Sequence, residues 1–308
     1  MTDTAAPSIL EHPVWYEPLR SPSWLLPKAD ADAPRIVFTP APAPTPAPGG
    51  ELQHDRELRE GLPMFLAEAV RYSTVARTAV AFDGSVDEGS IHAELAPIGT
   101  DGGRTLAVRL RGAAGEDLGT VTQPVSGDDD LGRAIGALPG AIGAALRPAG
   151  VRSVWSTVFQ MPAEAHAADL VRGYAICRFL RDPASHRDVS EDSEETARRR
   201  AAVDGALRRL ADLSGRVTTP FASMLFFAGL AACHEHGNPA YLGYRLSANG
   251  RCTTATDPRD AVFRISVLVF RLLGDPVIAG QRTRALAAAD DPDLRRWLTR
   301  IEGVGSLA

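Results

Sequence analysis

The sequence of 308 residues has no excess of positive charge, few cysteines and no long apolar run. Its formal net charge is -5, so no overall positive field exists to attract nucleic acid or an anionic membrane. Its three cysteines are widely spaced and odd in number, which excludes a disulfide framework and favours reduced thiols in a cytoplasmic protein. Because no stretch of about 18 apolar residues is unbroken, we expect no transmembrane segment.

Recognisable targeting and catalytic signatures are also missing. The first ten residues have neither a basic start nor a continuous apolar stretch, so we expect no secretory signal. No nucleophile elbow, phosphate-binding loop or dinucleotide-binding glycine pattern occurs. We therefore expect a protein with no catalytic residues and no cofactor.

Aromatic residues are scarce at 6%, yet two of the four tryptophans lie within residues 1–34. This segment is rich in proline, which removes a backbone donor and clashes with the preceding turn, so we expect an extended arm and no helix. Such an arm either folds back on its own domain or buries its aromatic side chains on a partner, as interface anchors do. The residues that would bind a partner are Trp15, Tyr16 and Trp24.

Residues 35–160 are expected to form an α+β domain, a mostly antiparallel sheet with two helices. In residues 91–95 and 106–111, apolar and polar residues alternate, which predicts strands with one buried and one exposed face. Glycine-containing turns join these strands into a three-stranded meander. The predicted strands are Arg35–Thr39, Ala76–Phe82, Ile91–Leu95, Leu106–Arg111 and Leu118–Val125. On the exposed face, His92 and Glu94 are expected to pair with Arg109 across the sheet.

Two helices complete this predicted domain. The first covers residues 61–72, with Pro63 in its first turn, where a missing donor is tolerated. The second runs over Leu131–Leu146, and Pro139 with Gly140 is expected to kink or split it. The run Asp128–Asp130 precedes this helix and is interpreted as its N-cap, because the helix dipole favours negative charge there.

Residues 161–308 are expected to be all-helical, since strand patterns disappear after about residue 163. Repeated Asp-Pro and Gly-Pro-type breaks separate short helices, which is typical of a stacked array of helical hairpins. The predicted helices are Ala167–Leu180, Glu194–Leu213, Pro220–His236, Ala240–Leu246, Arg259–Leu273, Pro276–Ala288 and Pro292–Ile301. The third and fifth are apolar nearly all round, so we expect both to be central.

The order of elements in residues 35–150 is strand, helix, strand, three-stranded meander, helix. Its distinctive residues are Arg35–Pro40 at the first strand, Glu60, Gly61, Leu62 and Leu66 in the helix, 75–78 at the second strand, Gly115 and Glu116 at a turn, and Leu131–Leu146. This pattern resembles the TolB-like N-terminal domain family, also called FlgO-like. The proline-rich segment 40–48 departs from the family's Asn/Ser-rich loop, so no site is carried over to that loop.

The helical half resembles tetratricopeptide repeats in places, at Gly274, Ala279 and Pro292, although the 34-residue period of that motif is not maintained. In bacterial signalling proteins, TolB-like domains are commonly followed by such helical repeats. The resemblance therefore implies an interaction or regulatory role, by analogy of fold and not from a site.

One string suggests metal chemistry. Cys233 and His236 share a helix face with His234 beside them, and Cys252 follows after the next turn. These four are the candidate metal ligands, but zinc sites are usually built from paired spacings and no second pair is present. The competing interpretation places both histidines at a helix C-terminus, where they interact favourably with the dipole.

Three functions remain as hypotheses. The leading one is a non-enzymatic scaffold or regulatory protein that binds a protein partner. The second is a sensor that binds a small molecule between its two domains. The third is a metal-dependent enzyme that uses Cys233, His234 and His236.

Overall fold

The computed structural model describes residues 8–29, 32–42, 53–96, 104–126, 128–154, 156, 159–187 and 194–304. Its tertiary contacts divide the chain into two compact units. The sheet unit contains Pro7–Pro13 and Pro27–Ala175, and the helical unit contains Val14–Leu26 and Ile176 onward. The units do not follow the expected boundaries after residues 34 and 160, because residues 8–26 are shared between them and the later boundary falls within a helix.

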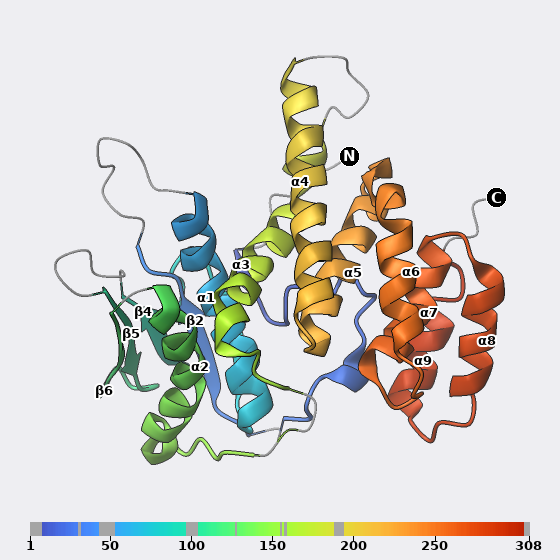
Figure 1. The fold of residues 1–308 in the computed structure, drawn as a ribbon. Helices are drawn as coiled ribbons and strands as arrows, with labels where there is room; N and C mark the ends of the chain where they lie inside the picture. Colours follow the sequence, from blue (N-terminus) through green and yellow to red (C-terminus); the bar gives the residue numbers. More distant parts are fainter. Residues whose placement is uncertain are drawn as a thin grey trace. The chain divides into compact units, whose positions relative to one another are not determined.

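The sheet unit is built on one six-stranded sheet in the order β1-β3-β2-β4-β5-β6 (Figure 1). Its strands are β1 (Ile9–Leu10), β2 (Arg35–Thr39), β3 (Arg77–Ala81), β4 (Ile91–Leu95), β5 (Arg104–Arg111) and β6 (Asp117–Val125). Strand β2 is parallel to both β3 and β4, whereas the other three pairings are antiparallel. The predicted meander is thus confirmed as β4-β5-β6, and the sheet as a whole is mixed.

The alternation in the sequence sets the two faces of the meander. In β4 the apolar positions are buried and the polar ones are half-buried, and in β5 the aliphatic side chains are buried while Arg109 is exposed. The buried side chains of these two strands are Ile91, Ala93, Leu95, Leu106, Val108 and Leu110. Helices α1 (Gln53–Ser73) and α2 (Asp128–Ala145) pack against strands of the sheet, so one face lies in the core.

Pro63 lies elsewhere in its helix than expected, and Pro139 does not split the helix that contains it. Helix α1 begins eight residues before residue 61, and Pro63 lies in its interior, not in its first turn. Helix α2 is continuous through Pro139. Pro63 and Leu58 are buried, so packing of the whole helix against its neighbours outweighs the missing backbone hydrogen bond.

Six of the seven helices predicted after residue 160 are confirmed, and the remaining one differs from the prediction. Where one short helix was predicted over Ala240–Leu246, the chain forms the 3-10 turn η4 (Pro239–Tyr244) and then α6. Short 3-10 turns also occur at η1 (Ser23–Leu25) and η3 (Pro183–His186). The α-helices are α3 (Glu164–Arg181), which enters the unit at Ile176, α4 (Glu194–Arg216), α5 (Pro220–Glu235), α6 (Arg245–Thr254), α7 (Ala261–Leu272), α8 (Pro276–Leu286) and α9 (Pro292–Arg300).

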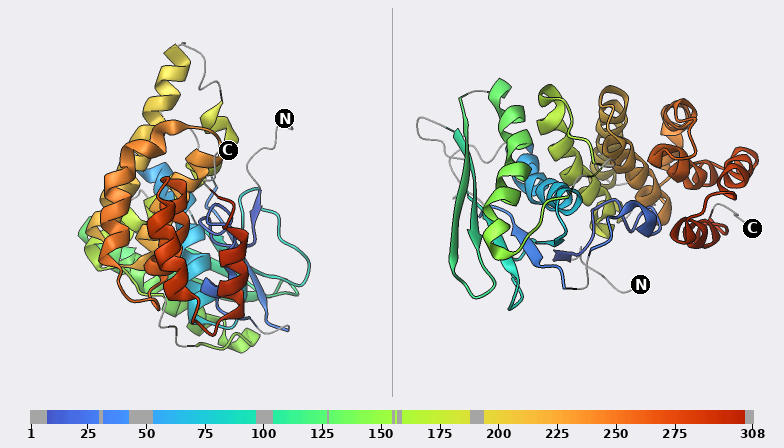
Figure 2. Two further views of the ribbon diagram at one scale, coloured as in Figure 1. Left: turned by 90° about the vertical axis from the view of Figure 1, so that its right-hand side faces the viewer. Right: turned by 90° about the horizontal axis from the view of Figure 1, so that it is seen from below.

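Helix α5 is the centre of this unit. Every residue from Phe221 to Cys233 is buried, and α5 contacts both α4 and α7, as Figures 1 and 2 show from three directions. Helix α8 packs on α7 in turn. Among the described residues, no helix has both the length and the apolar character needed to cross a bilayer.

Candidate functional site

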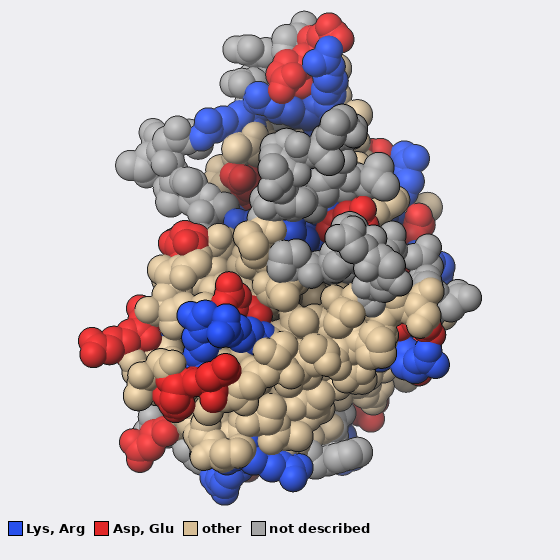
Figure 3. All heavy atoms as spheres, turned by 90° about the vertical axis from the view of Figure 1, so that its left-hand side faces the viewer, with Lys and Arg blue, Asp and Glu red and all other residues tan. Residues whose placement is uncertain are grey.

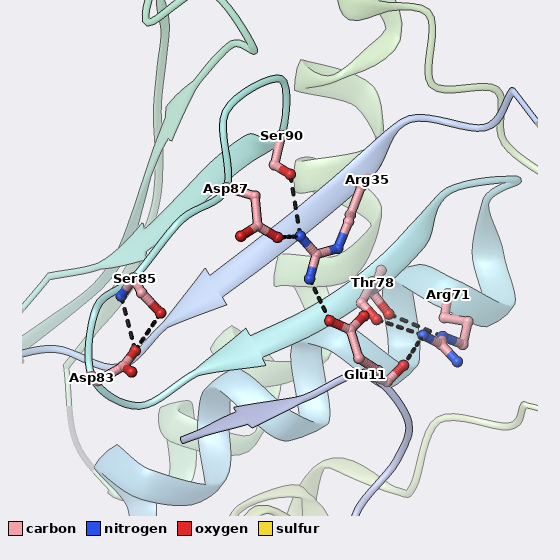
Figure 4. Close-up of polar contacts among 8 residues, drawn as sticks. All are labelled: Glu11, Arg35, Arg71, Thr78, Asp83, Ser85, Asp87 and Ser90. Carbon is pink, nitrogen blue, oxygen red and sulfur yellow. Dashed lines mark hydrogen bonds and ion pairs between the residues drawn. The ribbon is translucent and has the colours of Figure 1, made fainter. Parts of the chain in front are cut away.

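A cluster of polar contacts in the sheet unit lies where β1, β2 and the β3–β4 connection meet (Figure 4). The guanidinium of Arg35, at the start of β2, forms ion pairs with Glu11 and Asp87 and lies 3.5 Å from the Ser90 hydroxyl. Its side chain is largely buried, whereas both carboxylates are mostly exposed. Arg35 therefore joins the segment after β1 to the loop before β4.

A second arginine completes the cluster. Arg71, near the end of α1, donates to the carbonyl oxygen of Glu11 at 2.6 Å and, through Nε, to the Thr78 hydroxyl at 3.1 Å. The Thr78 hydroxyl donates in turn to the Ala67 carbonyl oxygen at 2.8 Å. These contacts connect α1, β3 and the segment that follows β1, so Arg71 stabilises the edge of the sheet.

The β3–β4 connection, residues 82–90, carries three polar residues at alternate positions. Asp83 accepts hydrogen bonds from the Ser85 backbone N–H at 2.9 Å and from the Ser85 hydroxyl, and these bonds lower the pKa of Asp83. Val86 of the same loop packs against a buried cluster on the sheet that contains Val37. With Asp87 bound to Arg35, the loop acts as a structural strap over that face.

His92 and Glu94 of the meander have other partners than the predicted Arg109. Glu94 lies opposite Arg109 in the sheet register, but its ion pair is with Arg111, at 3.8 Å. His92 shares a hydrogen bond of 2.9 Å with the Thr39 hydroxyl, and burial lowers the pKa of His92. The predicted contacts to Arg109 are replaced by neighbours on the same face.

The side of the sheet unit that carries β5 and β6 in Figure 1 is shown in Figure 3, and its described part is mostly uncharged. On β6, Thr120, Thr122 and Pro124 are exposed. Proline is typical of edge strands, because it lacks the N–H that a further strand would need.

The aromatic residues of the predicted arm lie in the helical unit. Trp15 is fully buried and packs edge-to-face on the half-buried Tyr16, with ring centroids 6.3 Å apart. Trp24 is half-buried and packs edge-to-face on Trp297 of α9 at 5.6 Å. Arg264 lies over the Trp24 ring, 5.3 Å from its centroid, a distance typical of a cation–π contact.

Backbone contacts hold the same segment on α9. The Trp297 Nε1–H donates to the Leu19 carbonyl oxygen at 2.9 Å, and the Arg300 guanidinium donates to the carbonyl oxygens of Arg20 and Ser21 at 2.9 and 3.1 Å. Arg20 and Ser21 have positive φ angles of 60° and 55°, which cost roughly 1 kcal/mol or more each. These contacts to α9 compensate the strain, so residues 14–26 form an integral part of the helical unit.

Whether the arm packs on its own chain or could bind a partner therefore differs from one aromatic residue to the next. Trp15 exposes no surface on which a partner could pack, so it belongs to the fold and not to an interface. Tyr16 and Trp24 keep part of their surface exposed, and their role in partner binding stays a prediction.

The predicted metal ligands do not converge. Among the described residues, no group of three or more His, Cys, Asp and Glu side chains could hold a metal ion. Cys233 and Cys252 are buried, and burial raises the pKa of each thiol to about 12. Because metals bind the thiolate, such an apolar environment disfavours coordination. The metal prediction for Cys233, His234, His236 and Cys252 is therefore wrong for this structure.

The two histidines have other neighbours. His234 packs edge-to-face on Tyr241 at 5.4 Å, and burial lowers the pKa of His234. His236 stacks on His186 with ring centroids 4.5 Å apart. The helical spacing in the sequence could not show that these side chains leave the helix in different directions.

The buried thiols give a direct test of the helical unit. We expect no fast reaction of native protein with a thiol reagent near neutral pH, because all three cysteines are buried and two have thiol pKa values of about 12. In denaturant, all three should react. A colorimetric thiol assay with and without denaturant measures this. Rapid reaction of one thiol in native protein would contradict the burial of the cysteines.

An exposed apolar pair at the η4–α6 junction was missed by the sequence reasoning. Leu246 is 86% exposed and Leu242, four residues earlier, is 51% exposed. Between them, Arg245 is exposed as well. The stretch was predicted as a short packed helix, and no pattern of spacing distinguishes an outward leucine from an inward one when the helix is so short.

Known proteins add no assignment. Comparison with models of protein families and with curated proteins finds no match to this sequence.

Proposed function

We propose that the protein is a non-enzymatic scaffold or regulatory protein, and that its helical unit binds a protein partner through Leu242 and Leu246. The observation that carries this proposal is the 86% exposure of Leu246, four residues after a second exposed leucine. Burying a leucine side chain contributes about 1.5–3 kcal/mol, so the pair offers a substantial gain to any partner that covers it. Apolar side chains grouped in this way are typical of interaction sites.

The neighbouring charge indicates the chemistry of the partner. Arg245 is exposed between the two leucines, while the next arginine along the helix, Arg251, is directed inward to the Ser223 hydroxyl at 2.7 Å. A partner that fits this surface has an apolar pocket for the leucines and a carboxylate at its rim for Arg245. Rim charges of this kind steer association and set specificity more than they add affinity.

Other features support the same proposal. The order of β2, α1, β3, the β4–β6 meander and α2 agrees with the resemblance to TolB-like N-terminal domains, and the successive helices of the helical unit agree with a repeat-like binding array. Buried thiols fit the reduced environment of the cytoplasm, where we place the protein. The half-buried Tyr16 and Trp24 extend the surface available to partners.

The test replaces one leucine. We expect Leu246→Asp to weaken binding of the partner by at least about tenfold, because a charged group cannot be buried in an apolar pocket without compensation. The partner is first captured from the native host with the wild-type chain, then purified, and its Kd is measured by titration calorimetry. Thermal unfolding should change little, since surface substitutions are usually within about 0.5 kcal/mol.

Val277→Asp is the matched control. Val277 on α8 is 67% exposed, so its replacement adds the same charge to another exposed apolar site of the helical unit. The control should bind like wild type. Equal Kd values for wild type and Leu246→Asp would contradict the proposal, and so would a wild-type chain that captures no partner.

A further inference from the structure

Asn238 is a buried residue whose amide orientation is set by a cap. Its side-chain oxygen Oδ1 accepts a hydrogen bond from the Ala240 backbone N–H at 3.1 Å, at the start of η4. The amide nitrogen Nδ2 must then point the other way, and it lies 3.3 Å from Nδ1 of His186. Since Nδ2 can only donate, His186 Nδ1 must accept and carry no proton.

The contact of the second ring nitrogen of His186 shows where its proton lies. His186 Nε2 lies 2.7 Å from the Leu180 carbonyl oxygen, which can only accept. His186 is therefore neutral, with its proton on Nε2, and both nitrogens are satisfied. Adding a proton at Nδ1 would set two donors against each other inside a site where His186 is only 6% exposed.

A second imidazole covers the first. The ring of His236, which follows α5, stacks on the His186 ring with centroids 4.5 Å apart and an interplanar angle of 25°. His236 Nε2 also lies 3.4 Å from the Arg181 carbonyl oxygen. The pair thus joins the end of α3 and the turn η3 to the end of α5 and the turn η4, entirely within the helical unit.

Few charged groups near His186 could stabilise its imidazole in the protonated form. Burial lowers the pKa of His186, the nearby His236 lowers it too, and the hydrogen bond to Leu180 and the charge of Asp182 act in the opposite direction. Helix α4 also packs against η3, but Glu194 and Glu195 at its start pair with arginines of their own helix. The Arg181 guanidinium is bound to Glu17 and to the Val14 carbonyl oxygen.

We propose that His186, His236 and Asn238 form a pH-sensitive latch within the helical unit, closed when the His186 imidazole is neutral and opened by its protonation. Protonation breaks the hydrogen bond from Asn238 and places a cation against the second ring. The end of α3 with η3 then separates from the end of α5 with η4. The latch makes the shape of this unit depend on pH in the range where histidine titrates.

The direction of the effect follows from linkage. An unfolded histidine titrates near pH 6.5, and the His186 pKa in the folded chain is lower. Between the two values, the unfolded or open state binds more protons than the closed state. Closed-state stability is therefore complete above about pH 7 and falls as the pH drops through about 6.5.

Hydrogen–deuterium exchange on the full chain tests the latch. At about pH 5.5, peptides covering residues 176–187 and 233–244 should exchange about tenfold faster than at about pH 7.5, after correction for intrinsic rates. Peptides from the centre of α5, such as residues 221–230, should keep their protection. Equal protection of the latch peptides at both pH values would overturn the proposal.

Asn238→Asp is expected to favour a protonated His186 in the closed latch instead of a neutral one. The carboxylate keeps the cap on η4 and can accept a hydrogen bond from a protonated Nδ1, so a charged His186 becomes favourable. We expect this variant to stay protected at about pH 5.5, at the level that wild type shows at about pH 7.5. Opening of Asn238→Asp in acid to the same extent as wild type would refute the assigned role of Nδ1.

His236→Phe is a second, independent variant. Phenylalanine preserves the stacked ring and removes the neighbour that lowers the pKa of His186. The pKa values of His186 in the closed and open states then differ less, so the acid-induced opening should shift to lower pH. An unchanged midpoint of opening would exclude His236 from the latch. This variant keeps the proposal testable if Asn238→Asp does not fold.

Discussion

Gly61→Ala is expected to lower the free energy of unfolding by about 3 kcal/mol, the upper end of what overpacking usually costs. Gly61 lies in α1, and a Cβ added there would lie 2.0 Å from the Val171 carbonyl oxygen and 2.9 Å from its carbon, in α3. These are backbone atoms of a helix, so they cannot move aside as a flexible side chain would. Urea unfolding followed by circular dichroism measures the loss.

Gly140→Ala is the control in the same unit. Gly140 lies in α2, is exposed, and has nothing within 4 Å of an added Cβ. Alanine there should stabilise the protein by up to about 1 kcal/mol through its better helix propensity. If Gly61→Ala were as stable as Gly140→Ala, the close approach of α1 to α3 would be wrong.

A second glycine shows the same geometry on α3. A Cβ on Gly132 of α2 would lie 1.8 Å from the Glu164 carbonyl oxygen, at the start of α3. Glu164 and Val171 are seven residues apart, and this spacing returns to nearly the same face of a helix. Helices α1 and α2 therefore each use a glycine to approach α3, and the two glycines fix how the three helices pack in the sheet unit.

The sheet could be predicted from sequence because its signal is local. Strict alternation in residues 91–95 and 106–111 needs no knowledge of distant residues, and the structure confirms both strands and their meander. The role of Gly61 could not be predicted in this way. Its spacing in the sequence fits a helix interior, but its purpose depends on Val171, which lies 110 positions later and makes its closest contact through its backbone.

For the candidate site residues, the sequence showed which side chains are chemically suited to a site, but not which of them meet in the fold. The short spacing of Cys233, His234 and His236 suggested ligands, yet the fold turns Cys233 into the core and His236 toward His186, fifty positions earlier. Likewise, a leucine at position 246 fits a packed helix or an interface equally well. Which side chains meet is decided by tertiary packing, and neither periodicity nor propensity contains that information.

The N-terminal segment shows the same limit. Proline and tryptophan correctly indicated that residues 14–26 form no α-helix and bury aromatic surface. This segment packs against Trp297. Trp297 lies 278 positions after Leu19 and donates a hydrogen bond to its carbonyl oxygen. Since no repeat or motif relates the two ends, the contact could only be found in the folded chain.

Trp297→Ala is expected to destabilise the helical unit by about 3–5 kcal/mol, the range for removing a large buried aromatic side chain. Trp297 is 1% exposed, and its loss removes the ring contact to Trp24 and leaves the Leu19 carbonyl oxygen without its donor. The strained turn at Arg20 and Ser21 then loses part of its support. Residues 14–26 should consequently detach more often than the rest of the unit unfolds.

Limited proteolysis and urea unfolding together measure this effect. In Trp297→Ala, cleavage within residues 14–26 should become faster than cleavage within α5, because the segment opens locally. Trp297→Phe keeps an aromatic ring against Trp24 and removes only the hydrogen bond to Leu19, so it should cost about 1–3 kcal/mol, mainly from the unsatisfied carbonyl. If the segment were cleaved equally fast in wild type and Trp297→Ala, it would not depend on α9, and Tyr16 and Trp24 would be free to act as the partner-binding arm instead.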